Sequence, residues 1–404
     1  MTVSSVIRLT GGQSAAYDRI VEWLGGAKKQ HLTLGGYAGT GKTTLIAYLR
    51  KRMTRSMKFR KWSVAFCCFT GKAANVLRQK LDEQAALRYG DSCSTIHALI
   101  YKAVLDDKGN AVAWTRKATD ELTQDLIIVD EASMVNKDIW EDLRSYGKPI
   151  LVVGDHGQLP PIGEDFNLMA DPELRLERIV RQEADNPIIQ LSMQIREGGD
   201  IPVGEYGPHV RKVASMPTQE LDAEFMHYDN STMVLCGYNR TRVALNKRIR
   251  AVLNFDQPEP SIGERVICLR NNRKENIYNG MLGTIEGIEP RHDDWYRSEI
   301  RLDGEQYAFE GVISRHQFGL PTTLRTEEDL ARIGIDDLVL KDIGDLFDWG
   351  YALTVHKAQG GEAKNVIVFE EKLPKYDRDT WQRWLYTAVT RSSDSLLIIG
   401  ASHF

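Results

Sequence analysis

The chain has 404 residues, enough for two or three domains that each bury an apolar core without a disulfide or a metal ion. Hydrophobic residues make up 42% and charged residues 27%, a composition that excludes disordered and fibrous proteins. The 52 basic residues against 56 acidic ones give a net charge of −4, which excludes a uniformly basic nucleic-acid binder. Any polyanion site must therefore be a local groove.

The cysteines and the N-terminal segment bear on the compartment. Five cysteines occur without a CxxC pair or a Cys/His cluster, which argues against a zinc site or a disulfide framework and favours a reducing compartment. The first residues, MTVSSVIRLTGGQSAAY, lack the pattern of a secretory signal, and apolar runs such as LIIV are too short to span a bilayer. We expect a cytoplasmic protein without a membrane partner.

The first third of the chain alternates short apolar runs with helical stretches, a pattern that predicts strand–helix units on a parallel sheet. A helix is expected at 43–53, and the turn DDKGN between two short runs predicts a β-hairpin inserted at 100–118. The expected strands are 31–36, 63–69, 125–130 and 149–154.

A second strand–helix series begins near residue 180. Its helices are expected at 187–197 and 240–253, with a strand at 232–237 between them. Short strands punctuated by Gly and Asn from 258 to 320 predict a small β-barrel. Because the strand–helix rhythm returns at 350–370 and ends with the strand 395–400, this barrel is expected to split a second α/β domain.

A phosphate-binding loop follows the first predicted strand. GYAGTGKTT at 36–44 matches G-x-x-x-x-G-K-[ST] between a strand and a helix, as that motif requires. Backbone N–H groups at the helix N-terminus would cradle phosphates, Lys42 would reach the β- and γ-phosphates, and Thr43 would hold Mg²⁺. The candidate nucleotide-binding residues are Gly36, Gly39, Thr40, Gly41, Lys42, Thr43 and Thr44.

Three further segments complete a hydrolytic set. In IIVDEAS, Asp130 suits the Mg²⁺ shell and Glu131 suits activation of the attacking water. In LVVGDHGQLPPIG, Gln158 would sense the γ-phosphate. In YTAVTR near the far end of the chain, Arg391 would be an arginine finger supplied across a domain cleft. The sequence therefore predicts nucleotide hydrolysis with Mg²⁺.

These motifs, in this order, resemble those of superfamily 1 helicases, and specifically the 5′-to-3′ branch typified by RecD and phage Dda helicase. The resemblance covers nearly the whole chain. It implies two RecA-like motor domains with parallel sheets, formed by 1–99 with 119–178 and by 179–255 with 346–404. It also implies that the hairpin 100–118 is a strand-separating pin and that 256–345 is an SH3-like β-barrel insertion.

The resemblance also implies roles for single residues. Gln13 in GGQSAAYDRI would read the adenine, Arg181 in RQEADNPIIQ would supply a second γ-phosphate arginine, and Gly361 would join the nucleotide site. For His97 and His356 a capping or packing role is equally open, and Trp114 fits packing on its own domain as well as strand separation. The implied DNA contacts are Thr70, Lys72, Thr95, His97, Trp114, Asn239, Thr354, His356 and Lys357.

The activity implied is ATP- and Mg²⁺-dependent 5′-to-3′ movement on single-stranded DNA with unwinding of the duplex. An RNA helicase or a non-unwinding translocase stays open, as does a nucleotide-gated DNA-binding accessory protein with weak ATPase. The implied partners are single-stranded DNA, junctions of single- and double-stranded DNA, and single-stranded-DNA-binding or replisome proteins. We expect a monomer in a bacterial or phage-infected cytoplasm, associated with the nucleoid.

Overall fold

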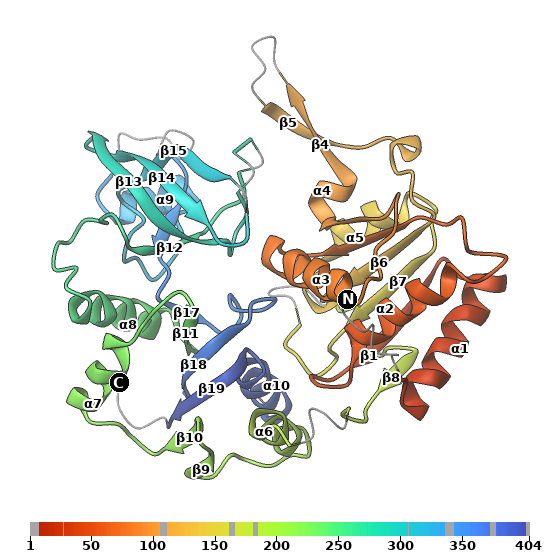
Figure 1. The fold of residues 1–404 in the computed structure, drawn as a ribbon. Coiled ribbons are helices and arrows are strands. Elements are labelled where there is room, and N and C mark those ends of the chain that lie inside the picture. The colour runs from red at the N-terminus through yellow and green to blue at the C-terminus, as the bar shows by residue number, and fades with distance from the viewer. Residues whose placement is uncertain are drawn as a thin grey trace.

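The structure is a computed structural model of the whole chain, and it describes residues 8–26, 28–105, 111–160, 166–180, 185–272, 274–275, 277–305, 307–335, 343–371 and 377–400. Within these ranges no helix is both long and apolar enough to cross a membrane. Three bodies are visible in Figure 1: a sheet with helices on the right, a second such unit at the lower left, and a β-rich unit above the second one.

The first unit is a six-stranded parallel sheet in the order β3-β2-β6-β7-β1-β8. Every residue of its central strands β2, β6 and β7 is buried, as expected of a parallel sheet that is covered on both faces. Its strands are β1 (His31–Gly36), β2 (Val64–Cys68), β3 (Ser92–Thr95), β6 (Leu126–Asp130), β7 (Ile150–Gly154) and β8 (Leu174–Leu176). Its helices are α1 (Gly11–Gly26), α2 (Lys42–Met53), α3 (Gly71–Glu83), α4 (Ile96–Ile100) and α5 (Lys137–Arg144), with 3-10 turns η1 (Thr119–Glu121) and η2 (Ala132–Met134).

The second unit is a six-stranded sheet in the order β17-β11-β18-β19-β10-β9. All of its strand pairs are parallel except β9 with β10 at one edge. Its strands are β9 (Gly204–Gly207), β10 (Val210–Val213), β11 (Thr232–Cys236), β17 (Ala352–Thr354), β18 (Ala363–Phe369) and β19 (Ser392–Ile399). Its helices are α6 (Pro187–Arg196), α7 (Thr218–Met226), α8 (Asn239–Val252) and α10 (Arg378–Val389).

The two insertions are antiparallel. A hairpin of β4 (Tyr101–Leu105) and β5 (Ala111–Arg116) projects away from the first sheet in Figure 1. The larger insertion is a five-stranded sheet in the order β15-β14-β13-β12-β16. Its elements are β12 (Arg265–Cys268), β13 (Leu282–His292), β14 (Trp295–Leu302), β15 (Ala308–Ser314), α9 (Glu327–Arg332) and β16 (Phe347–Trp349).

Backbone hydrogen bonds join β15 of this larger insertion to residue 345, which lies just before β16. The Ser314 N–H donates to the Asp345 carbonyl at 2.9 Å, and the Asp345 N–H donates to the Val312 carbonyl at 2.8 Å. The sheet therefore closes on itself beside β16, which follows residue 345, where the insertion was expected to end.

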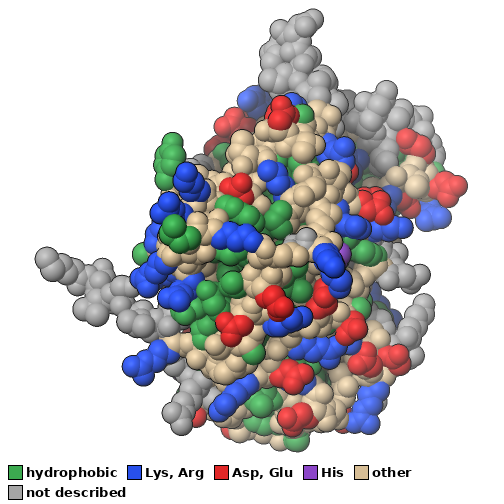
Figure 2. All heavy atoms as spheres, turned by 90° about the vertical axis from the view of Figure 1, so that its right-hand side faces the viewer, with side chains coloured by type: hydrophobic (Ala, Val, Ile, Leu, Met, Phe, Trp, Pro, Cys, Tyr) green, Lys and Arg blue, Asp and Glu red, His purple; other side chains and the backbone are tan. Residues whose placement is uncertain are grey.

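Apolar layers fill both faces of each parallel sheet. In the first unit one layer includes Ile20, Leu45 and Phe66, and the opposite layer includes Ile139 and Leu143. On the outer face of this unit, Figure 2 shows Lys and Arg side chains gathered along the left edge and mixed with Asp and Glu side chains elsewhere.

Candidate functional site

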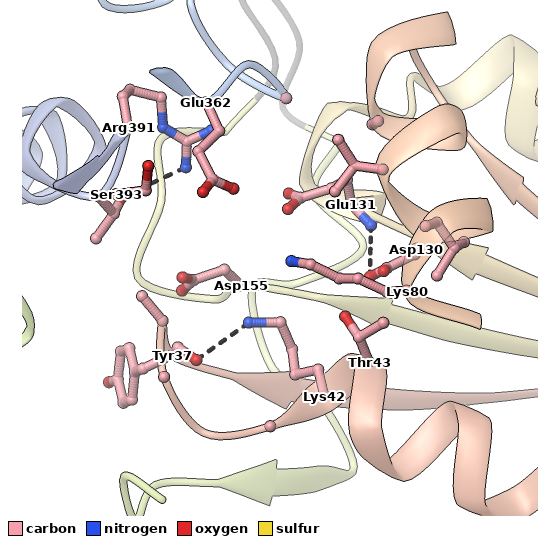
Figure 3. A pocket seen from close by; sticks show the side chains of 18 of the residues that line it. Tyr37, Lys42, Thr43, Lys80, Asp130, Glu131, Asp155, Glu362, Arg391 and Ser393 are labelled. Atoms are coloured by element: carbon pink, nitrogen blue, oxygen red, sulfur yellow. Dashed lines mark hydrogen bonds between the residues drawn. The ribbon is translucent and has the colours of Figure 1, made fainter. Parts of the chain in front are cut away.

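A cavity of about 610 Å³ lies between the two parallel sheets, where strand ends of both units meet. The first unit contributes the loop before α2, the end of β6 and the end of β7, and the second contributes the segments 360–362 and 390–393. In Figure 3, Lys42 and Lys80 point into this cavity from one side and Arg391 and Glu362 face them from the other. Two sequence-distant halves of the predicted hydrolytic set therefore share one cavity.

The phosphate loop has the shape that its glycines predict. Gly39 and Gly41 have φ angles of 74° and 77°, in the left-handed region that favours glycine, and α2 begins directly after Gly41. The Lys42 Nζ donates to the carbonyls of Gly36 at 2.6 Å and Tyr37 at 3.1 Å, which holds the amine over the loop. An open helix N-terminus with a lysine folded over it is a ready anion site, so the loop fits a nucleotide's phosphates.

Asp130 and Glu131 lie where β6 ends. Burial first, and then the neighbouring Glu131 charge, raises the pKa of Asp130 to about 6, and its Oδ1 accepts a hydrogen bond from the Glu131 N–H at 2.9 Å. Glu131 has a φ of 53°, and its Oε2 is buried without a hydrogen-bond partner in the described part of the chain. Two closely spaced, poorly solvated carboxylates favour a cation, so this site fits Mg²⁺ shared with a nucleotide.

The loop after β7 carries Asp155 and Gln158. Asp155 lines the cavity, and its Oδ1 accepts a hydrogen bond from the Gly157 N–H at 2.9 Å. Gln158 is 5% exposed and also lines the cavity, and its Oε1 has no partner among the described residues. A buried amide oxygen facing a phosphate site is chemically suited to orient a water molecule or a ligand hydroxyl.

Arg391 reaches the cavity from just beyond α10. Its guanidinium donates to the Gly361 carbonyl at 2.8 Å and to the Thr387 carbonyl at 3.1 Å, and the side chain is 5% exposed. Gly361, which was expected in the nucleotide site, lines the same cavity.

Three predicted nucleotide-site residues do not line this cavity. Gln13 is buried, and its side-chain amide donates to the Thr40 carbonyl at 3.0 Å, so it supports the phosphate loop from behind. Thr40 in turn donates to the Tyr37 carbonyl at 2.7 Å, and Gly36 accepts from Lys42. Arg181 lies outside the described residues. The remaining predicted residues that line the cavity are Gly39, Gly41, Lys42, Thr43, Thr44, Asp130, Glu131, Gln158 and Arg391.

A second cavity, of about 310 Å³, lies where the first unit, the second unit and the larger insertion meet. Four of the predicted DNA contacts line it: Thr70, Thr95, His97 and Lys357. Thr70 and Thr95 cap α3 and α4, accepting the N–H groups of Ala73 at 3.2 Å and Ala98 at 3.1 Å. Two helix N-termini therefore open onto this cavity, which suits a phosphate backbone.

Aromatic rings and one lysine complete the second cavity. The ring centroid of His97 lies 5.2 Å from that of Tyr278 in the insertion and 5.8 Å from that of Tyr101. Burial first, and then the charge of Arg242, lowers the pKa of Lys357 to about 8. A strand of nucleic acid would meet stacking surfaces together with a cation here.

The other predicted DNA contacts are placed differently. Thr354 ends β17 and is 7% exposed, and burial lowers the pKa of His356, but neither residue lines the second cavity. Asn239 begins α8, and Glu371 binds the backbone just before this helix. That carboxylate accepts hydrogen bonds from the N–H groups of Gly237 at 2.6 Å and Tyr238 at 3.0 Å and from the Thr241 hydroxyl at 2.5 Å. The side chains of Lys72 in α3 and Trp114 in β5 lie outside the described part of the structure.

The sequence reasoning missed a contact of the larger insertion with α3. The Glu305 carboxylate contacts Gly71 at the start of α3, and the Asn75 side chain donates to the Gly304 carbonyl. Burial raises the pKa of Glu305. A carboxylate therefore lies at one of the helix N-termini beside the second cavity; no local pattern in the turn Asp303–Glu305 signals this.

Residues 8–209, half of the chain, match the profile of the protein family described as "AAA domain". The chain belongs to this AAA-domain family. A further part of the AAA-domain chain, residues 350–399, matches the UvrD-like helicase C-terminal domain.

Curated relatives of this AAA-domain chain include helicases. The ATP-dependent RecD2 DNA helicase of Deinococcus radiodurans is 27% identical over 419 residues, which cover 97% of the chain and 49% of that protein. The chain thus spans about half the length of this relative. The ATP-dependent DNA helicase Pif1 of Campylobacter jejuni is 24% identical, over 83% of the chain and 81% of that protein. The predicted resemblance to superfamily 1 helicases of the RecD type is confirmed.

A solved structure supports the fold of the AAA-domain chain. The crystal structure of the Pif1 helicase from Bacteroides in complex with ADP-AlF3 and single-stranded DNA has a TM-score of 0.52 and 18% identity, covering 97% of this chain and 92% of that one. Together with the two parallel sheets, this likeness confirms the predicted α/β fold of the RecA-like type.

Proposed function

We propose that this chain is an ATP- and Mg²⁺-dependent DNA helicase that moves on single-stranded DNA in the 5′-to-3′ direction. The observation that carries the proposal is the cavity of about 610 Å³ in which Lys42, Asp130 and Glu131 of one parallel sheet face Arg391 of the other. Hydrolytic residues divided between two units tie the chemistry to the relative position of those units. The similarity to RecD2 and Pif1 helicases supports the choice of DNA and of polarity.

At the nucleotide site each residue has one task. Lys42 and the N-terminus of α2 bind the phosphates, and Thr43 and Asp130 would hold Mg²⁺, which supplies charge neutralisation on the phosphate oxygens. Glu131, with its unpaired buried oxygen, orients and deprotonates the attacking water, and Gln158 positions that water against the γ-phosphate. Arg391, and Arg181 with it, stabilises the charge that develops on the transferred phosphoryl group.

At the DNA site the contacts are chiefly to the backbone, because a translocase must accept any sequence. Thr70, Thr95, His97 and Lys357 contact the strand in the second cavity. The proposed contacts also include Lys72, Asn239, Thr354 and His356. Gly360 and Gly361 line both cavities, so closure around ATP moves one wall of the DNA site.

The insertions have separate roles in this proposal. The hairpin 100–118 is the pin that divides the two strands, with Trp114 at the fork. The insertion 256–345, whose sheet also includes β16 just beyond it, is an SH3-like barrel that covers the strand. The motor domains are 1–99 with 119–178 and 179–255 with 346–404. The chain works as a monomer that meets junctions of single- and double-stranded DNA.

The test is strand displacement on two partial duplexes, one with a 5′ single-stranded tail and one with a 3′ tail, with and without ATP. Release that needs ATP and occurs only with the 5′ tail is the expected result. Release only with the 3′ tail would overturn the polarity, and no release with intact DNA-stimulated ATPase would identify a non-unwinding translocase. Stronger ATPase stimulation by a matched RNA would identify an RNA helicase, and DNA binding without stimulated hydrolysis would identify an accessory protein.

A further inference from the structure

Tyr386 of α10 joins the second unit to the phosphate loop of the first. Its hydroxyl donates to the Asp155 Oδ2 at 2.6 Å and accepts a hydrogen bond from the Ala38 N–H at 2.9 Å. The side chain is 1% exposed, and both of its partners line the nucleotide cavity. A single buried hydroxyl thus connects two walls of the cavity across the boundary between the units.

Three more hydrogen bonds fix the loop after β7 to the same unit. Arg383 donates to the His156 carbonyl at 2.8 Å, Thr387 accepts from the Leu159 N–H at 3.0 Å, and Gln359 donates to the Leu159 carbonyl at 2.6 Å. Residues 383, 386 and 387 lie on one face of α10, since positions three and four apart are neighbours on a helix. The second unit therefore grips the loop that carries Gln158.

The backbone connects Arg391 directly to α10, the helix that makes these contacts. α10 ends at Val389, two residues before Arg391, and the Arg391 N–H donates to the Ala388 carbonyl at 3.2 Å. Tyr386 and Arg391 therefore move as one body, and the contact of Tyr386 with Ala38 and Asp155 sets how far Arg391 extends into the cavity.

We propose that the Tyr386 hydroxyl is an interdomain latch, a positioning residue that holds α10 on the phosphate loop and thereby sets Arg391 for hydrolysis. The inference rests on the proposed ATPase. Tyr386 acts through Asp155 and Ala38 and does not take part in ATP binding by Lys42 and Thr43. Burial first, and then the Asp155 carboxylate, raises the pKa of Tyr386 far above its ordinary range, so the hydroxyl keeps the proton that it donates.

The chosen variant is Tyr386→Phe, which keeps the ring beside Tyr37 and removes only the oxygen. It removes the Tyr386 partner of the Ala38 N–H and of the Asp155 Oδ2, while the Asp155 Oδ1 keeps its bond from the Gly157 N–H, a change that costs roughly 10-fold in rate. We expect kcat of the DNA-stimulated ATPase to fall about 10-fold while KM for ATP stays within about 2-fold. In the Tyr386→Phe background, Asp155→Asn is expected to cost much less than it does alone, since both changes break one contact.

The matched control is Tyr351→Phe. Tyr351 is 2% exposed and donates a buried hydrogen bond to Glu264 at 3.3 Å, away from both cavities. The Tyr351→Phe variant is expected to have a lower melting temperature and unchanged kcat and KM. An unchanged kcat in Tyr386→Phe, fully additive losses with Asp155→Asn, or an equal loss in Tyr351→Phe would each overturn the latch.

A second readout needs neither DNA nor ATP. Because the Tyr386 hydroxyl joins the two units, Tyr386→Phe is expected to open the cleft and raise the radius of gyration in small-angle X-ray scattering, and Tyr351→Phe is expected to leave it unchanged. Identical scattering from wild type and Tyr386→Phe would overturn the latch. A wild-type chain without DNA-stimulated hydrolysis would overturn the proposed function instead, and scattering would then decide the latch alone.

Discussion

The affinity for single-stranded DNA is expected to fall as the pH rises from 7 to 9, because of Lys357. This residue lines the second cavity, and burial, followed by the charge of Arg242, lowers its pKa from 10.5 to about 8. A lysine is charged below its pKa, so the charged fraction falls from roughly 90% at pH 7 to roughly 10% at pH 9. If only the charged amine contacts a phosphate, Kd rises about 10-fold over this range.

Few other groups near this site titrate between pH 7 and 9. Burial lowers the pKa of His356, so its ring stays neutral throughout. Burial likewise raises the pKa of every cysteine thiol well above this range. His97 also lines this cavity and is present in both the wild type and Lys357→Arg, so the difference between these two proteins reports on Lys357.

The assay is fluorescence anisotropy with a labelled adenine homopolymer, whose bases do not titrate in this range, at constant ionic strength. The control is Lys357→Arg, because a guanidinium keeps its charge at pH 9, and its Kd is expected to be flat. The slope of log Kd against log salt is expected to shrink by about 0.7 at pH 9 in the wild type, as one phosphate contact is lost. A flat wild-type Kd, or equal pH dependence in Lys357→Arg, would refute this reasoning.

Three further substitutions have defined outcomes. Lys42→Ala is expected to abolish phosphate release in a coupled ATPase assay and to leave the melting temperature unchanged, because the Lys42 amine bonds only to carbonyls of its own loop; normal hydrolysis would exclude this nucleotide site. Arg391→Ala is expected to lower kcat by about 10³-fold while a fluorescent ATP analogue still binds, and lost analogue binding would point to a folding defect. Glu305→Gln is expected to bind single-stranded DNA more tightly and faster in stopped-flow measurements, because a charged carboxylate no longer faces the start of α3. The control is Glu310→Gln, which changes an exposed residue of the same sheet. Equal affinities in both variants would contradict the prediction.

The sequence predicts the elements whose signals are local. The expected strand 31–36 coincides with β1, and the expected helix 187–197 coincides with α6. In a buried strand and in a helix with one apolar face, the spacing of apolar residues is visible over a short stretch of sequence. The motif GYAGTGKTT also lies between a strand and a helix, as expected, because it is contiguous in the sequence. Short edge strands such as β8 and β9 carry three or four residues and no such period, and no strand was expected at these positions.

Contacts between distant segments could not be predicted in this way. Tyr386 and Ala38 are 348 residues apart, and nothing in YTAVTR shows that the tyrosine hydroxyl meets the phosphate loop. Glu371 accepts the N–H of Tyr238, just before Asn239, from 133 residues further along the chain, and no motif signals this contact. The Gln13 side chain donates to the Thr40 carbonyl 27 residues away, a contact that GGQSAAYDRI does not reveal. Each of these placements depends on packing between elements that no single motif encodes.

The glycine pair at 360–361 has a consequence for inhibition. Both residues line both cavities, and a side chain at Gly360, whose φ is 69°, would come within 2.9 Å of the Met134 sulfur. A small molecule that fills the 310 Å³ cavity would contact residues 360–361 on the side opposite to the nucleotide cavity. Such a compound would compete with the nucleic-acid strand and lower the maximal ATPase rate without competing with the nucleotide, so double-reciprocal plots against ATP would show lines that do not meet on the rate axis.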